Sequence, residues 1–587
     1  MSILQFMHDY VIRNGLVYDG LGGEPYEADI AFSGNKISHV GEVKDSGKEE
    51  IDAKDKIVTP GFVDIHTHFD GQITWDPFLS PSHYHGVTTA IMGNCGVGFA
   101  PCKPERHEWL IGLMEGVEDI PGTALSEGIK WNWETFPEFM DAVDDMELSV
   151  DVGLQVPHGA LRAYVMDERA AQLEPANDED IELMSNHVKE SLNAGALGFS
   201  TSRTEKHRDK DGNNTPTFKA QDKELHGIAK GMSEVDKGVI QLIADFWDFD
   251  YEFFMIKEMA RIAGRPLSLT IEQDYRYPDL WKKTLDSISV ANEEGINMKG
   301  QVPPRPTGVL QGLSATLNPF VFYPSFQKLR DLSVDEKVAA LKNQDFRKQI
   351  LSEKVDLDPD NILSLILTHF DKIFIFGDSP NYEPSYEESV EYLSKQKGVS
   401  PLEFVLDYMI EDNGYSLLYM PIMNYVKGNL DDVHYMLTHK YTAFGLGDGG
   451  AHCGIMTDYS FPSTLLTHWA RDRSRGPKLP LEFIIKRQTR DNALHIGLFD
   501  RGVLADGMKA DINIIDFDNY KLLKPKIAYD LPLGGKRFIQ KTEGMLYSFA
   551  SGELISKGGI PTGLKKGKLI RGIQEKANLT HSNVAAE

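Results

Sequence analysis

Cysteine is scarce in this sequence, whose 587 residues include three: Cys95, Cys102 and Cys453. Three irregularly spaced cysteines do not make a disulfide framework, which favours a reducing compartment. Long apolar runs are missing too, because none approaches the ~18 residues that a membrane span needs. Residues 1–10 lack the basic and apolar segments of a secretory signal. We therefore expect a cytoplasmic protein that does not bind membranes.

Basic residues are few relative to acidic ones, with 61 Lys and Arg against 88 Asp and Glu and a net charge of −27. This negative excess disfavours nucleic acid and anionic membranes as partners. The hydrophobic content of 41% and the charged content of 25% are ordinary for a globular protein. We expect a small-molecule substrate, and the sequence predicts no particular oligomeric state.

Two histidines stand two residues apart, His66 and His68, at the end of an apolar run. Such a run is typical of a strand buried on both faces in a parallel sheet. Residues i and i+2 of a strand point the same way, so the two imidazoles converge. They are placed to hold a metal ion, although two histidines satisfied by hydrogen bonds in a core would show the same pattern.

A carboxylate far along the chain favours the metal site. Residues 442–448, Thr-Ala-Phe-Gly-Leu-Gly-Asp, predict another short apolar strand that ends at Asp448 in a glycine-rich turn. If the first and last strands of a barrel are neighbours, Asp448 lies beside His66 and His68. We therefore predict that these three residues share a metal ion.

Short apolar runs predict eight strands in the middle of the chain. Helical periodicity separates several of them, for example in residues 180–195, where Gly195 supplies a stop. Eight strands alternating with helices predict an α/β fold of the (β/α)8 TIM-barrel type. The predicted strands are 62–66, 87–93, 149–156, 196–200, 238–244, 266–271, 296–302 and 441–446.

The two ends of the chain share a different pattern, in which short predicted strands are separated by turns such as Asn-Gly. Neither end has enough strands to bury a sheet alone, so we predict that residues 1–59 and 500–587 combine into one small β-sandwich. The barrel then occupies residues 60–499. The interval from 302 to 441 is several times longer than one crossover helix, which predicts an insertion at about 303–440 that shapes substrate choice.

Polar residues that follow the other strands are further site candidates, because barrel active sites lie at the carboxyl ends of the strands. Cys95 follows the second strand and either ligates zinc as a thiolate or is an inert buried thiol. His158 follows the third strand and either binds substrate or orients a ligand. A basic cluster with Arg203 and His207 follows the fourth strand; it is a clamp for a substrate carboxylate or a solvated loop.

Taken together, these tracts resemble the amidohydrolase superfamily, and specifically its N-acyl-D-amino-acid deacylase (D-aminoacylase) branch. The resemblance implies hydrolysis of a linear amide, with one or two Zn²⁺ ions held near His66, His68 and Cys95 and with Asp448 as ligand and proton carrier. His452, with Arg203, His207 and His158, is a candidate for substrate binding. The motifs are Val11-Ile-Arg-Asn-Gly, Pro60 to His68, Trp75-Asp-Pro, Gly86 to Pro101, Asp448-Gly-Gly and Gly502 to Asp511.

The sequence departs from this branch where the branch has histidine ligands, after the fifth and sixth strands. Those strand ends carry Asp245 and Glu272 instead. Asp245, Glu272, His207 or His452 substitutes for the histidines, or one metal is weak or absent. The fourth strand also lacks the bridging lysine of hydantoinase-like members, which weakens a cyclic amide as substrate. Hydrolysis of a cyclic amide, lactone or other small substrate on the same barrel is kept as an alternative. A scaffold without metal chemistry is the remaining alternative.

Overall fold

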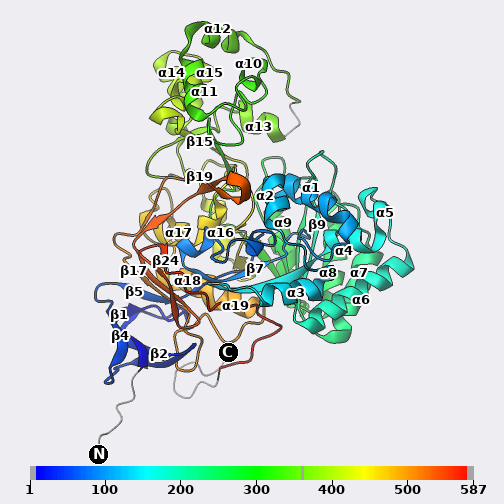
Figure 1. Ribbon diagram of the computed structural model, residues 1–587, viewed down its shortest axis with the longest axis vertical. Helices are drawn as coiled ribbons and strands as arrows, with labels where there is room; N and C mark the ends of the chain where they lie inside the picture. The colour runs from blue at the N-terminus through cyan, green and yellow to red at the C-terminus, as the bar shows by residue number, and fades with distance from the viewer. Residues whose placement is uncertain (1–7, 359–361, 578–587) are drawn as a thin grey trace, which may run out of the picture.

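The computed structural model describes residues 8–358 and 362–577. Its centre is an eight-stranded parallel sheet in the order β6-β7-β8-β9-β10-β11-β12-β16 (Figure 1). Each strand lies where the sequence predicts it, so the predicted barrel is confirmed. The strands are β6 (Phe62–Asp64), β7 (Val87–Met92), β8 (Asp151–Pro157), β9 (Gly198–Arg203), β10 (Val239–Ala244), β11 (Leu267–Thr270), β12 (Met298–Val302) and β16 (Thr442–Phe444).

The first and last strands meet just beyond their carboxyl ends. Thr67 and Gly449 form a parallel bridge, and the backbone N–H of His68 donates to the carbonyl of Gly449 at 2.7 Å. The N–H of Asp448 donates to the carbonyl of His66 at 3.0 Å. The backbone itself therefore brings Asp448 beside the two histidines.

Helices connect the strands as the periodicity predicts. The helix expected in residues 180–195 is α6 (Asp178–Ala194), which begins with a capping box between Asn177 and Asp180. It ends at Gly195, whose φ of 112° suits glycine. Among the described residues, no helix is both long and apolar enough to cross a membrane.

Strands from both ends of the chain form one nine-stranded sheet, as predicted. β5 (Ile57–Pro60) lies between β1 (His8–Val17) and β17 (Ile512–Ile515), so early and late segments are hydrogen-bonded directly. β1 pairs with β4 (Gly47–Asp52) along its first half and with β5 at its end. The division into residues 1–59, 60–499 and 500–587 stays a prediction; residues 1–7 and 578–587 lie outside the described ranges.

Between β12 and β16 the chain builds a separate lobe above the barrel, green to yellow in Figure 1. Its apolar core packs helices against a three-stranded antiparallel sheet of β13 (Gly308–Gln311), β15 (Leu417–Pro421) and β14 (Phe374–Phe376). The lobe ends before α16 (Asp431–Thr438), which contacts β12 and β16 in the place of a crossover helix. The helices include α11 (Val334–Lys342), α12 (Gln344–Ser352), α14 (Val390–Lys397) and α15 (Pro401–Met409).

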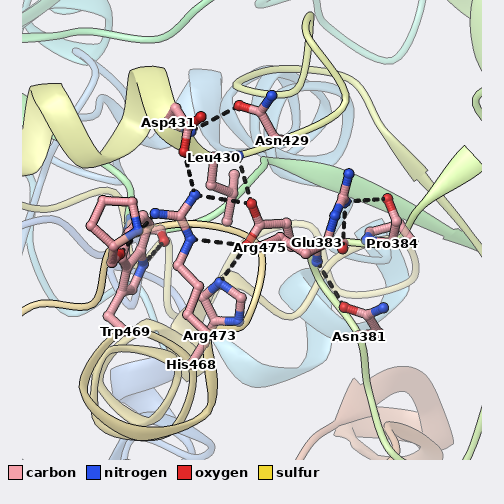
Figure 2. Close-up of polar contacts among 12 residues, drawn as sticks. Asn381, Glu383, Pro384, Asn429, Leu430, Asp431, His468, Trp469, Arg473 and Arg475 are labelled. Carbon is pink, nitrogen blue, oxygen red and sulfur yellow. Dashed lines mark hydrogen bonds and ion pairs between the residues drawn. The ribbon is translucent and has the colours of Figure 1, made fainter.

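A cluster of polar contacts around the buried ion pair of Glu383 and Arg473 fastens this lobe to the barrel (Figure 2). We call it the clasp; its members are Glu383, Asp431, His468, Arg473 and Arg475. The Glu383 carboxylate accepts two hydrogen bonds at 3.0 Å from Arg473 and lies 3.0 Å from His468. Burial alone would raise the pKa of Glu383, but the hydrogen bonds from His468 and Arg473 outweigh it and lower the pKa to about 2.

Candidate metal centre

Four side chains from three separate segments meet at the carboxyl end of the barrel. One ligand atom each from His66, His68 and Cys95 lies within 4.8 Å of the others, the one such group found among the described residues. Asp448 Oδ1 lies 3.4 Å from His66 Nε2 and 3.6 Å from His68 Nε2. We call these four residues the metal centre.

The other ring nitrogen of each imidazole faces a polar partner, a hydrogen bond for His66 and a nearby carboxylate for His68, and each Nε2 is directed to the shared point. His66 Nδ1 lies 2.6 Å from Gln301 Oε1, and Ser268 orients the Gln301 amide by accepting from its Nε2 at 2.9 Å. His68 Nδ1 lies 3.2 Å from Glu118 Oε1. A partner of this kind fixes the tautomer of a metal-binding histidine and raises its basicity.

Cys95 reaches the centre from a tight turn after β7, where it adopts a φ of 53°. Its backbone N–H donates to Gln241 Oε1 at 2.7 Å, and its Sγ lies 3.3 Å from His66 Nε2. Burial opposes a thiolate here, but the charge and hydrogen bond of His66 lower the pKa of Cys95. The thiol is therefore prepared to act as an anionic ligand.

The electrostatics of the centre favour a bound cation. Burial opposes charge on His66, yet the Cys95 thiolate raises the pKa of that imidazole to about 9. Burial would also raise the pKa of Asp448, but His68 and His66 lower it well below its usual range. Asp448 Oδ1 is buried and accepts no hydrogen bond from any residue that the structure describes. Two nitrogens, one sulfur and one oxygen are a donor set that zinc accepts, so the residues fit a metal ion.

A cavity of about 720 Å³ opens above the metal centre. His207 and His452, which the sequence suggests as substrate-binding residues, line it together with Lys206 and Arg208. His207 Nδ1 lies 2.9 Å from Ser202 Oγ. Burial and the positive charges of His68 and His452 lower the pKa of His207 to about 3, so this imidazole is neutral.

Arg203 and His158 do not line this cavity, contrary to the sequence-based expectation. The guanidinium of Arg203 pairs with Glu252 at 3.0 Å. His158 uses both nitrogens, at 2.8 Å from Thr201 Oγ1 and 2.9 Å from Glu224 Oε1. Each side chain bonds an acid on the surrounding helices, α8 (Phe249–Ala263) for Arg203 and α7 (Asp222–Val235) for His158. We do not retain either residue as a substrate ligand.

Asp245 and Glu272 are not part of the metal centre. They follow the fifth and sixth barrel strands, where the deacylase branch has histidine ligands. Asp245 accepts hydrogen bonds from Thr204 Oγ1 at 2.6 Å and the Glu205 N–H at 2.7 Å, and it does not line the cavity. Glu272 does line the cavity, where burial raises its pKa and Thr307 donates to it. Within the described residues, one group that could hold a metal ion is therefore present.

Four buried residues that contact the metal centre or its neighbours were not predicted from the sequence. Glu118 belongs to α1 (His107–Glu118), and nothing in the sequence of that helix marks it. Gln155, Gln241 and Gln301 lie buried on β8, β10 and β12, and contact Asn94, Cys95 and His66 respectively. Alternate barrel strands supply one interior layer of side chains. A glutamine in each of three alternate barrel strands is the signal that would have found this layer.

Comparison with known proteins gives similar chains over most of the length. An uncharacterized protein of Mycobacterium bovis is 26% identical over 544 residues, which cover 87% of this chain and 84% of that protein. A D-aminoacylase of Alcaligenes xylosoxydans xylosoxydans is 30% identical over 194 residues, 33% of this chain and 37% of that enzyme. An N-acyl-D-glutamate deacylase of the same organism is 27% identical over 51% of this chain and 57% of its own length.

Two kinds of solved structure share the fold. A D-aminoacylase described with a binuclear metal centre superposes with a TM-score of 0.63 at 20% identity, covering 96% of this chain and all of its own. An N-acyl-D-glutamate deacylase of Bordetella bronchiseptica, complexed with zinc and a phosphonate inhibitor, gives the same values. The profile described as Amidohydrolase family matches residues 49–557. The chain therefore belongs to the amidohydrolase family.

Proposed function

We propose that this protein hydrolyses the amide bond of an N-acyl-D-amino acid and releases a carboxylate and the free amino acid. Membership of the family makes it a hydrolase of carbon–nitrogen bonds other than peptide bonds. The observation that carries the proposal is the approach of Asp448 Oδ1 to within 3.4 and 3.6 Å of two imidazole Nε2 atoms at the floor of a cavity. The D configuration follows the names of the similar deacylases.

His66, His68, Cys95 and Asp448 would hold one Zn²⁺ ion. When bound, zinc supplies a Lewis acid for the amide carbonyl and lowers the pKa of water from 15.7 to about 7. Gln301 and Glu118 keep the two imidazoles in the tautomer that presents Nε2. The sequence is compatible with one or two metal ions, and these four donor residues support one.

Asp448 is the proton carrier in this proposal. Its lowered pKa keeps the carboxylate ionised, so it accepts a proton from the attacking water. It then delivers that proton to the nitrogen of the departing amine, which leaves as the free amino acid. His207, neutral and 2.9 Å from Ser202, lines the same cavity as a hydrogen-bonding group.

The loop after β9 would bind the substrate carboxylate. Lys206 and Arg208 bring positive charge to the cavity in a protein whose net charge is −27. Lys206 Nζ lies 3.8 Å from Asp274, so part of its charge is already balanced. Arg208 offers the planar fork that suits a carboxylate.

The test is a turnover screen with N-acetyl and longer N-acyl amino acids, both enantiomers, with and without added Zn²⁺. We expect release of free amine, detected with an amine-reactive dye, from the D series. Release from the L series alone would refute the configuration. Ring opening of a cyclic amide or lactone without amine release from the linear amides would favour the alternative substrate. No bound transition metal and no activity on adding one would favour the metal-free scaffold.

A further inference from the structure

The cavity above the metal centre has two chemically different walls. One is the loop Thr204–Arg208, which carries Lys206, His207 and Arg208. The other is apolar, and most of it comes from the lobe inserted between β12 and β16. The residues of this apolar wall are Val309, Leu317, Ile366, Ile422, Ile455 and Met456, and they belong to one hydrophobic cluster.

The two walls face each other across the barrel mouth. The basic loop follows β9, and Ile455 and Met456 follow β16, which is four strands away in the order of the eight-stranded sheet. In a closed barrel of eight strands, two strands that are four positions apart lie on opposite sides of the barrel. The Leu310 N–H donates to the carbonyl of Ile455 at 2.8 Å, which fixes the lobe to the loop after β16.

A linear amide would span these walls in one orientation. The acyl group and the carboxylate-bearing carbon lie on opposite sides of the scissile carbon–nitrogen bond. If the carboxylate meets the basic loop while the carbonyl lies over the metal centre, the acyl group extends toward the apolar wall. The cavity of about 720 Å³ lies within the range of about 300–1,000 Å³ that encloses drug-sized ligands.

We propose that the substrate is an N-acyl amino acid with a long aliphatic acyl chain, and that the inserted lobe supplies the surface on which the chain lies. This inference rests on the proposed amide hydrolysis. Water adds across the carbon–nitrogen bond, so that the carbonyl carbon leaves as a long-chain carboxylate and the nitrogen as the free amino acid. No other co-reactant is needed.

The first test compares kcat/KM for the acetyl, butanoyl, octanoyl and dodecanoyl derivatives of one D-amino acid. Burial of a methylene against an apolar surface improves binding by roughly fourfold. Burial is incomplete in an open cavity, so we expect octanoyl to exceed acetyl by at least about 30-fold. Equal or falling kcat/KM with chain length would overturn the inference while leaving the amide hydrolysis intact. A gain with bulky amino-acid side chains instead would also overturn it.

A binding measurement separates this inference from the proposed function. Dodecanoate and acetate are titrated calorimetrically into the metal-loaded protein. Tighter binding of dodecanoate, by about 30-fold or more, supports the apolar wall even if no amide is hydrolysed. Equal binding of both carboxylates, or of neither, would overturn it.

A pair of isoleucine variants locates the surface. Ile422 is half-buried and lines the cavity, whereas Ile410 is half-buried in the same lobe but packs only against its helical core. Ile422→Ala should lower the octanoyl-to-acetyl ratio of kcat/KM about fivefold, and Ile422→Trp should shift the optimum to shorter chains. Ile410→Ala should leave the ratio unchanged. Equal ratios in both alanine variants would contradict the assignment.

Discussion

The protein contains two charge clusters, the clasp and the metal centre, whose buried carboxylates Glu383 and Asp448 differ in how completely they are paired. In the clasp, Arg473 donates to both oxygens of Glu383, to Asp431 and to the carbonyl of Pro477. In the metal centre, Asp448 Oδ1 accepts no hydrogen bond from a described residue. Two imidazole Nε2 atoms and a thiol point to the same place.

This difference separates a structural cluster from a functional one. Buried polar groups are nearly always hydrogen-bonded, and unpaired ones require an explanation. In the clasp, both oxygens of the Glu383 carboxylate are paired with the Arg473 guanidinium. The metal centre gathers anionic and imidazole donors that a cation would satisfy together. The convergence of donor atoms on one point, rather than burial or charge alone, therefore distinguishes the candidate metal centre from the clasp.

The largest expected effect is that of Asp448→Asn. The amide cannot carry the proton, so kcat should fall by about 10²–10⁴-fold. The same change in the clasp, Asp431→Asn, should leave kcat within about twofold, because general acid–base work is absent there. Turnover of both variants and their metal content by elemental analysis are the measurements. Near-normal turnover by metal-loaded Asp448→Asn would remove the proton-carrier role.

The next effect is on stability, in Arg473→Met. This change leaves Glu383 buried with fewer donors, and breaking a buried pair in this way costs about 3–5 kcal/mol. Lys283→Met removes an exposed pair with Asp250, which is worth about 0–1 kcal/mol. Denaturant unfolding, followed by fluorescence, compares the two variants with the parent. A smaller loss for Arg473→Met than for Lys283→Met would contradict the structural role of the clasp.

Acid should weaken the clasp. Because the pKa of Glu383 is lowered to about 2, its contribution is fully present above the unfolded-state pKa of about 4.3. It is lost as the pH falls toward 2, and amounts to about 2–3 kcal/mol. The free energy of unfolding of the parent should therefore approach that of Glu383→Gln between pH 5 and pH 2. A constant difference over this range would show that Glu383 is not held as an anion.

The smallest expected effect is on metal affinity, in Glu118→Gln. Loss of the carboxylate behind His68 should weaken metal binding by about 10–100-fold. Glu115→Gln on the same helix is the matched control, because Glu115 caps the N–H of Gly122 at 3.0 Å and does not contact His68. Competition with a chromophoric chelator measures both affinities. Equal affinities in the two variants would show that Glu118 does not orient the ligand.

Local patterns in the sequence predict the barrel and the meeting of the candidate ligands, because strand periodicity and strand order determine both. The i, i+2 spacing places His66 beside His68, and closure of the barrel brings Asp448 to them. The partners of the ligands depend on packing between distant segments. Glu118 reaches His68 only because α1 folds back over the barrel mouth after β7.

Arg203 is the opposite case, a residue that the sequence predicts at the site but that does not line the cavity. It ends a barrel strand and so satisfies the rule for site residues, but neighbouring side chains on a strand alternate in direction. Ser202 contacts His207 on the cavity side, and Arg203 points to Glu252 on the helix side. An error of one residue in the expected strand register therefore moves a side chain from the cavity side to the helix side.

We propose that His66, His68, Cys95 and Asp448 bind one metal ion. X-ray absorption at the zinc edge of the Zn²⁺-loaded protein tests it most directly, together with the metal content of the parent and of Cys95→Ser. We expect one ion per chain with nitrogen and oxygen neighbours and one sulfur neighbour at about 2.3 Å, which is lost in Cys95→Ser. A spectrum without sulfur in the parent, or one unchanged by Cys95→Ser, would contradict it.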